Sequence, residues 1–391
     1  MDGCQGFTAA GIRAGIKGNN EKDLGLILCD RPATVAGVFT QNRFAASSVD
    51  WTRERCAAGT ARALVVNSGN ANCCTGPEGA AHTRQMASLA ADALGLAPEA
   101  VLVASTGVIG LPLPVERIEA GMASLVAALD ATAGFDAFSR AIMTTDTTPK
   151  QVTASVEVDG KTVTVVGVAK GSGMIRPNMA TLLGFLCTDA AIAPDVLKPL
   201  LKSVVDKTFN RISVDGDTST NDMVVVMANG ASGVCVDETS ETFSALLENV
   251  CRQLSQQIVR DGEGATKFVT VHVKGAKTRE DAFRVADTVA HSNLVKTALF
   301  GEDANWGRIV AAAGRSGVML DPNRLDVWFD DVLLFSNGTG RTLEVEAAAS
   351  AVLKKAAFTL MLDLNMGTVE EILWTCDFSV DYVKINADYR S

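Results

Sequence analysis

The chain has 391 residues, with 35 Lys and Arg against 45 Asp and Glu, so its formal net charge is −10. A surface with this excess of acid is a poor electrostatic match for phosphate backbones and anionic lipid headgroups, so we expect neither nucleic acid nor a membrane as a partner. Hydrophobic residues make up 47% of the chain. That share predicts a folded chain with a large core, divided into two or three structural units.

Residues 1–18 contain no continuous apolar run, and no later stretch approaches the roughly 18 apolar residues of a membrane span. We therefore expect a cytoplasmic protein. The nine cysteines include no Cys-x-x-Cys pair, which argues against a disulfide framework and against a zinc site. We interpret the adjacent Cys73 and Cys74 as structural, because sequence neighbours rarely ligate one metal together.

The apolar periodicity alternates between about 3.6 and 2, so helices and strands are mixed along the chain. In chain order, the predicted elements are a strand at Ala63–Val66, a helix at His82–Leu94, a strand at Val101–Ala104, a helix at Val115–Leu129, strands at Val152–Val158 and Thr162–Ala169, a helix at Asp195–Lys207, a strand at Met223–Ala228, a helix at Glu241–Val259, a strand at Phe268–Val273, a helix at Arg279–Phe300, and strands at Arg324–Phe329, Ile372–Phe378 and Tyr382–Ile385. The two strands around Asp159-Gly160 are predicted to form a hairpin, because both turn residues tolerate positive φ.

The hairpin runs into the most unusual segment of the chain, which begins at Lys170-Gly171-Ser172-Gly173 and ends with Asn178-Met179-Ala180-Thr181. Glycine and proline interrupt the strand pattern here, and a strand is predicted to restart at Thr181. Taken alone, the two glycines are a weak phosphate-loop signal. An isolated Thr181 would simply be a β-former that opens a strand.

As a whole, this segment closely resembles the self-cleavage region of the ornithine acetyltransferase family. The resemblance extends in order through residues 22–24, 32–40, 67–72, 105–110, 143–147, 215–222, 261–267, 301–308 and 386–391, so it covers essentially the full chain. Two residues depart from the family pattern: Arg176 stands where a small residue is more usual, and Cys73 where alanine is. Neither alters a functional position, although Arg176 could change the cleavage rate.

The resemblance implies that the chain cuts itself between Ala180 and Thr181 into an alpha chain, residues 1–180, and a beta chain, residues 181–391. Thr181 then becomes an N-terminal nucleophile. An N-terminal threonine carries its own base, since the ordinary pKa of an α-amine is about 7.7–8.0. No Ser-His-Asp arrangement is therefore needed, and we expect no catalytic role for His82, His272 or His291.

The resemblance also assigns the remaining site residues. Thr106 and Gly107 would stabilise the oxyanion, as acyl transfer requires. Lys170 would be a substrate-contacting cation, and Glu263 a carboxylate for the ammonium of an amino acid. Further substrate contacts are implied for Thr147, Asn386 and Ser391, with the chain end folded back into the pocket. Without the family, these would be ordinary loop and strand-end residues.

The implied reaction takes acetyl from N-acetyl-L-ornithine onto Thr181 and passes it to L-glutamate, a step of arginine biosynthesis. Whether acetyl-CoA is also used stays open. The implied fold is a layered α/β sandwich of the N-terminal-nucleophile kind, distinct from the doubly wound dinucleotide-binding folds. Its two cleaved chains would interlock and pair into a heterotetramer of two alpha and two beta chains, without any cofactor or metal.

Three alternatives stand beside this interpretation. The acidic residues Asp215, Asp217 and Asp222 suggest calcium, but Val226 occupies loop position 12, so we favour a hydrogen-bonded turn. An N-terminal-nucleophile amidase or aminopeptidase on a related fold would use water in place of glutamate. A non-catalytic amino-acid-binding protein would remain uncleaved.

Overall fold

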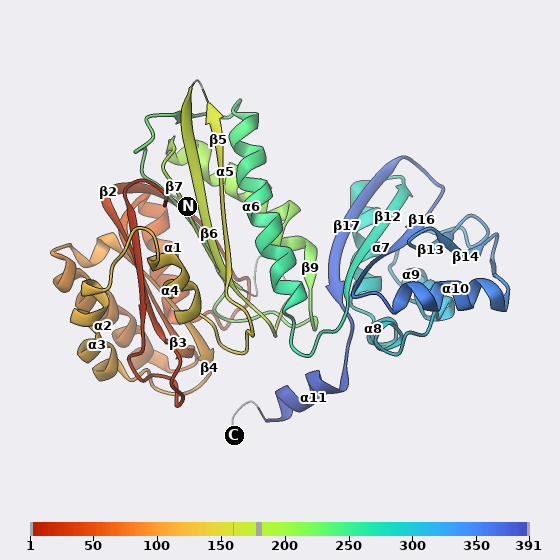
Figure 1. The fold of residues 1–391 in the computed structure, drawn as a ribbon, viewed down its shortest axis with the longest axis horizontal. Coiled ribbons are helices and arrows are strands. Elements are labelled where there is room, and N and C mark those ends of the chain that lie inside the picture. The colour runs from red at the N-terminus through yellow and green to blue at the C-terminus, as the bar shows by residue number, and fades with distance from the viewer. Residues whose placement is uncertain (1–2, 159, 177–181, 389–391) are drawn as a thin grey trace. The chain divides into compact units, whose positions relative to one another are not determined.

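The computed structural model describes residues 3–158, 160–176 and 182–388. The chain divides into two compact units, the first comprising Met1–Asn210 and Asp217–Ile258, and the second Arg211–Gly216 and Val259–Ser391. Among the described residues, each unit contains one large sheet with helices packed on it (Figure 1). The prediction of a layered α/β fold is confirmed.

Within its described residues, the first unit contains an eight-stranded sheet in the order β4-β3-β2-β10-β7-β6-β5, with β1 paired to β2. These strands are β1 (Phe7–Ile12), β2 (Leu24–Phe39), β3 (Thr60–Asn70), β4 (Val101–Val108), β5 (Lys150–Val158), β6 (Lys161–Lys170), β7 (Leu183–Thr188) and β10 (Met223–Ala228). The short strands β8 (Ala191–Ile192) and β11 (Cys235–Val236) pair separately. The β5–β6 hairpin is confirmed, with Val158 opposite Lys161.

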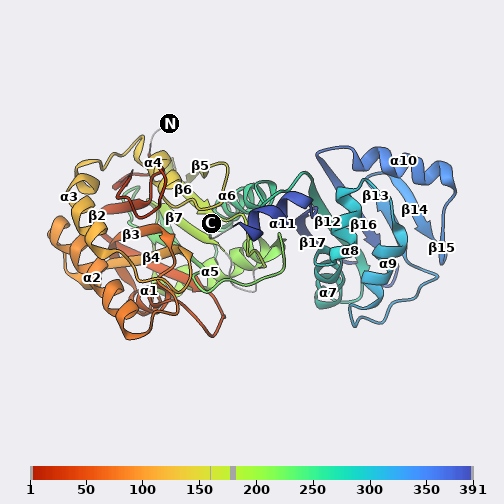
Figure 2. The same cartoon turned by 90° about the horizontal axis from the view of Figure 1, so that it is seen from below.

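Helices cover both faces of this sheet. They are α1 (Ser47–Ala58), α2 (Gly76–Leu94), α3 (Val115–Ala127), α4 (Gly134–Ala141), α5 (Pro194–Lys207) and α6 (Glu241–Arg260). Alternate residues of β2 to β4 point to opposite faces, and α2 and α3 pack side by side against one face while α4 packs on the other (Figure 2). On β6, Gly167 lies against Val250 and Leu254 of α6.

In the described part of the second unit, a seven-stranded sheet has the order β15-β14-β13-β16-β12-β17-β9. Its strands are β9 (Ile212–Ser213), β12 (Phe268–Ala276), β13 (Asp326–Phe329), β14 (Val332–Ser336), β15 (Thr339–Gly340), β16 (Ala357–Asp363) and β17 (Val369–Cys376). The helices are α7 (Arg279–Ala290), α8 (Asn293–Phe300), α9 (Trp306–Gly314), α10 (Leu343–Leu353) and α11 (Val380–Ala387). Apolar residues of α7, α9 and α10 share one core with this sheet.

Two predicted elements are wrong. The predicted helix Arg279–Phe300 is two helices, because Ser292 leaves the helical conformation and its side chain caps α8 by accepting the N–H of Val295. The predicted strand Tyr382–Ile385 belongs to helix α11, which begins after Ser379, whose side chain accepts the N–H of Tyr382. The alternation of apolar and polar residues there matched the strand period although a cap precedes it.

The 16-residue strand β2 is absent from the sequence prediction. Its pattern is interrupted at Asp30-Arg31-Pro32, which are exposed. The strand continues through them with a register shift against β3 between Leu28 and Ala33. Its second half pairs with β10, so this strand joins the N-terminal strands to the rest of the sheet.

Candidate active site

The end of β4 forms a close-packed turn. β3 and β4 run parallel, with Gly107 paired to Gly69. Gly107 has φ +132°, and a Cβ atom on it would lie 2.3 Å from the carbonyl carbon of Gly69. Only glycine fits this position. The preceding Thr106 is 8% exposed, so the turn places a nearly buried hydroxyl beside tightly packed backbone.

A buried asparagine braces this turn. Asn221 Nδ2 donates hydrogen bonds to the carbonyl oxygens of Ser105, at 2.8 Å, and Ala71, at 2.6 Å. Asn221 belongs to the acidic run considered for calcium. Of the residues that the structure describes, no three His, Cys, Asp or Glu side chains are grouped to hold a metal ion, and Asp215 accepts a hydrogen bond from the Tyr382 hydroxyl at 3.2 Å.

Lys170 is the last residue of β6 and lies next to Thr106, although 64 residues separate the two in sequence. Its Nζ donates to Thr144 Oγ1 at 2.7 Å and to Thr106 Oγ1 at 3.4 Å. The lysine is 9% exposed. The structure therefore brings together the ammonium and the hydroxyl that the sequence predicted separately.

A fully buried carboxylate, Asp146, supports this lysine. Its Oδ2 lies 3.9 Å from Lys170 Nζ, and its Oδ1 accepts from Lys150 Nζ at 2.7 Å. The backbone N–H groups of Gly171 and Thr144 donate to the same carboxylate at 2.8 and 3.0 Å. Burial works to raise the pKa of Asp146, but the Lys170 and Lys150 cations and these hydrogen bonds outweigh it and hold the pKa well below its ordinary range.

The segment after Lys170 is held at both described ends. Gly171 is bound by Asp146, and Ile175 forms a bridge with Thr218. The Thr218 hydroxyl donates to the Arg176 carbonyl at 3.1 Å. The predicted cleavage residues Ala180 and Thr181 lie outside the described residues. The chain resumes at Leu182, and the next residue pairs with Lys170 across β6 and β7.

Glu263 and Asn386 lie together in the second unit. Glu263, in the turn after α6, is 8% exposed, and its Oε2 accepts a hydrogen bond from Asn386 Nδ2 at 2.8 Å. Asn386 is carried by α11, one turn beyond Tyr382, so the corrected helix is what positions it. A Cβ on Gly264 would lie 2.5 Å from the backbone nitrogen of Tyr382, which explains the glycine beside Glu263.

Two predicted substrate residues remain, Thr147 and Ser391. Thr147 follows Asp146 in the loop before β5 and is exposed. Ser391 lies outside the described residues. The histidines make carboxylate contacts away from these groups: His82 with Glu78, His272 with Glu370 and His291 with Asp287.

The sequence prediction missed several residues of the site. Asp146, Thr144 and Asn221 lie inside motifs that carried the family resemblance, so the motifs were a usable signal. Lys150 gave none, because a lysine beginning a strand is normally exposed. Lys17 is a further partly buried cation, and burial is the main cause that lowers its pKa, with Lys170 among the charges acting in the same direction.

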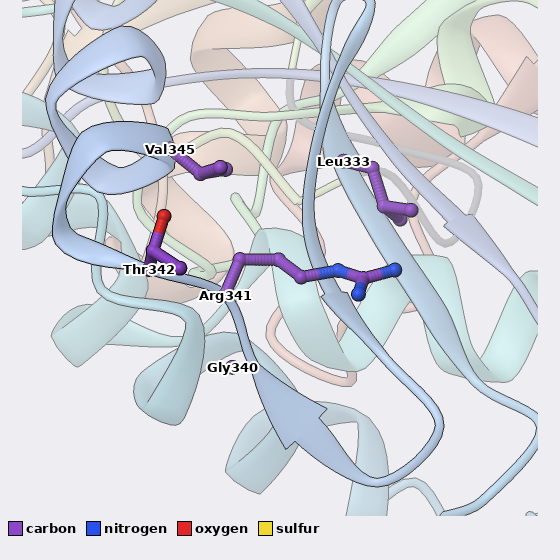
Figure 3. A pocket seen from close by; sticks show the side chains of 5 residues that line it. All are labelled: Leu333, Gly340, Arg341, Thr342 and Val345. Atoms are coloured by element: carbon purple, nitrogen blue, oxygen red, sulfur yellow. The ribbon is translucent and has the colours of Figure 1, made fainter.

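The second unit also contains an open cavity of about 520 Å³ beside β14, β15 and the start of α10 (Figure 3). It is lined by Leu333, Gly340, Arg341, Thr342 and Val345. These residues include none of the predicted site residues. We assign it no function.

Comparisons with known proteins identify relatives of the whole chain. The model of the ArgJ family matches residues 8–391. The arginine biosynthesis bifunctional protein ArgJ of Symbiobacterium thermophilum is 50% identical, with 99% of this chain and 97% of that one covered. The protein of the same name from Geobacter sulfurreducens is also 50% identical, with 99% of both chains covered. The crystal structure of the ArgJ protein of Bacillus halodurans is 39% identical, with a TM-score of 0.50, and covers 52% of this chain and 98% of that chain.

These matches identify the class as acyltransferases of arginine biosynthesis. The chain belongs to the ArgJ family. In the described parts of the chain, no helix is both long and apolar enough to cross a membrane.

Proposed function

We propose that this chain transfers acetyl from N-acetyl-L-ornithine to L-glutamate through an acetyl-Thr181 intermediate, after it cuts itself between Ala180 and Thr181. The observation that carries the proposal is the meeting of Lys170 Nζ and Thr106 Oγ1, 3.4 Å apart, at the strand end from which the cleavage segment departs. These two groups come from different motifs of the family. Their proximity is what a shared acyl-transfer site requires.

Cleavage would release the α-amine of Thr181, which in its neutral form accepts the proton of the Thr181 hydroxyl. The hydroxyl oxygen then attacks the acetyl carbonyl carbon. The oxyanion that develops would be stabilised by the Thr106 hydroxyl and the Gly107 N–H. The tetrahedral intermediate collapses, the C–N bond breaks and ornithine leaves with the proton. Glutamate attacks the acetyl ester by the reverse sequence and regenerates Thr181.

Charge complementarity suggests how the substrates are held. Lys170 would bind a carboxylate, and Glu263, oriented by Asn386, would bind the ammonium group of an amino acid. Thr147 and Ser391 would complete the binding site. The nearly buried state of Lys170 and Glu263 strengthens such charge-assisted contacts because water competes less.

The proposal includes two chains, residues 1–180 and 181–391, paired as a heterotetramer in the cytoplasm. The crystallised Bacillus halodurans chain supports cleavage, because nearly all of it aligns with only 52% of this chain. That is the length expected for one product of a cut near the middle. A reducing compartment is supported by the nine cysteines, all of which are free thiols.

Intact-mass measurement tests the proposal. We expect purified protein to contain chains of 180 and 211 residues, and N-acetylornithine alone to add one acetyl group to the 211-residue chain. Glutamate should then remove it as N-acetylglutamate with ping-pong kinetics. The Thr181→Ala variant should stay uncut and unacetylated.

A parallel incubation with acetyl-CoA as sole donor decides whether it also acylates Thr181. Release of free acetate in place of N-acetylglutamate would show a hydrolase instead. An uncut chain that binds ornithine without acetylation would show a binding protein. Cleavage of Thr181→Ala at the same bond would show that Thr181 does not cut its own chain.

A further inference from the structure

Of the predicted oxyanion and substrate residues that the structure describes, the Asp146 carboxylate contacts Lys170. It also joins three segments of the first unit. It accepts from Thr144 N–H in the loop before β5, from Lys150 Nζ at the start of β5, and from Gly171 N–H at the start of the cleavage segment. Through Lys170 it reaches a fourth segment, the Thr106 turn at the end of β4.

Both lysine and carboxylate side chains lie around the Asp146 carboxylate. Lys150 is 1% exposed and the side chain of Asp146 is wholly buried. Lys170 and Lys17 are the other cations near the carboxylate, and Glu21 and Asp23 act on Lys17. Asp23 itself accepts the backbone N–H groups of Ala14 and Lys17, and Asp146 Oδ2 lies 3.9 Å from Lys170 Nζ.

We propose that the buried Lys150–Asp146 pair is a positioning device of the acyl-transfer site, which holds the Lys170 ammonium against Thr106 and fixes Gly171 for self-cleavage. This inference rests on the proposed function of Lys170 and Thr181. Lys150 binds Asp146 Oδ1 and leaves Oδ2 facing Lys170 at 3.9 Å. At this distance the carboxylate attracts the ammonium electrostatically but does not form a short hydrogen bond with it. Lys170 is thereby left to donate to the two threonine hydroxyls.

Stability alone is a weak reason for such a pair. Removing two charges from water costs free energy that their attraction often fails to recover, and apolar replacements of buried pairs are frequently neutral or stabilising. General packing would not require the Asp146 contacts to fall on particular residues of the site. They converge on the last residue of β6 and the first residue after it.

The test compares Asp146→Asn with a matched control, Asp189→Asn. Asp189 is also a buried carboxylate, and it accepts the N–H of Thr164 on the same strand, β6, at 2.8 Å. We expect Asp146→Asn to slow self-cleavage and to lower kcat/KM for N-acetylornithine by about 10²-fold, mainly through KM, as for a reacting group displaced by an ångström. Asp189→Asn should change both by less than about threefold, because Thr164 lies six residues before Lys170 on the strand.

A pH profile separates positioning from general weakening. Without the carboxylate, Lys170 faces Lys150 and Lys17 with less compensation, so its ammonium loses its proton at lower pH. The basic limb of kcat/KM should therefore move down by at least about one pH unit in Asp146→Asn. It should stay in place in Asp189→Asn. A merely structural Asp146 would lower the melting temperature and leave the limb where it is.

The amide introduced by Asp146→Asn must turn its N–H₂ group toward a backbone donor, so this variant could fail to fold. Thr144→Val is the second variant, since it removes one of the two hydroxyl acceptors of Lys170 and keeps Thr106, the carboxylate and both lysines. We expect wild-type melting, an unshifted basic limb and a KM raised about tenfold, as for a lost charge-assisted hydrogen bond.

The outcomes are distinguishable. If the wild type neither cuts nor transfers acetyl, the proposed function fails and the positioning role that rests on it fails with it. If the wild type does both while Asp146→Asn matches Asp189→Asn in cleavage, KM and basic limb, the positioning role is overturned. A Thr144→Val enzyme with wild-type KM would overturn it equally, because Lys170 would then not need to be held.

Discussion

Backbone packing requires glycine at position 107. A β-carbon there would meet the backbone of Gly69 and Asn70 at 2.3 to 2.7 Å. Gly110, three residues later, has φ +86°, and a β-carbon on it would meet no atom within 4 Å, so it shares the unusual backbone without the close approach. Substitutions at the two glycines therefore separate the cost of positive φ from the cost of a steric clash with the backbone.

We expect Gly107→Ala to lower kcat by at least about 10²-fold, since moving the turn misplaces the oxyanion donors, and to destabilise the fold by about 1–3 kcal/mol through overpacking. Gly110→Ala should cost about 1 kcal/mol from its positive φ and keep nearly full activity. Steady-state kinetics and urea unfolding measure both. Equal losses of activity in the two variants would contradict the role given to the Gly69 contact.

Several site residues could be predicted from the sequence, and others could not. Thr106, Lys170, Glu263 and Asn386 were predicted from motifs, and the structure places them as two pairs, one in each unit. Lys150 gave no signal because burial of a charge depends on the partners that the fold supplies, and here its Nζ lies 2.7 Å from the buried Oδ1 of Asp146.

At the scale of elements, two serines perform the same local task in different settings. Ser379 caps α11 and Ser292 caps α8, each by accepting the N–H three residues on, at 3.3 and 3.4 Å. Helix α11 has no buried residue, whereas α8 buries Val295, among others, in the core of the second unit. Loss of the cap should therefore have different consequences in the two helices.

We expect Ser379→Ala to raise KM for N-acetylornithine several-fold, because α11 carries Asn386, which orients Glu263. The melting temperature should barely change. Ser292→Ala, the matched control, should lower the free energy of unfolding by about 1 kcal/mol and leave KM as it is. Kinetics together with hydrogen exchange of α11 measure this, and an unchanged KM with a frayed α11 would show that Asn386 is dispensable.

Predictions of elements succeeded where the pattern was long and uninterrupted, as in the predicted helix Glu241–Val259, observed as α6. They failed where a cap or a bulge overrides the period. The serine between α7 and α8 looks like any other residue in a helical pattern, and its capping role depends on a local hydrogen bond.

At the scale of the whole molecule, the expected cleavage point and the two compact units are different divisions. The units divide near Asn210 and Ile258. The cut between residues 180 and 181 would pass through the first unit, between β6 and β7, which pair antiparallel. β10, which would belong to the beta chain, also pairs with β2, which would belong to the alpha chain.

We therefore expect the cut chains to stay together in native size-exclusion chromatography and to separate only in denaturant. Residues 1–180 expressed alone should aggregate, because β2 and β6 would expose unpaired edges. Co-expression of residues 1–180 with 181–391 should restore a soluble complex. A soluble, folded 1–180 monomer would contradict the shared sheet.

The sequence by itself determined the family, the class of fold and the hairpin of β5 and β6, and it predicted candidate site residues, because motifs and periodicity are local properties. Only the tertiary structure decided which of these residues meet. Lys170 reaches Thr106 because β6 and β4 end at neighbouring places in one unit, and Asp146 is charged and buried because two lysines and two backbone N–H groups converge on it. Such convergence arises from strand order and register, which no single segment of the chain encodes.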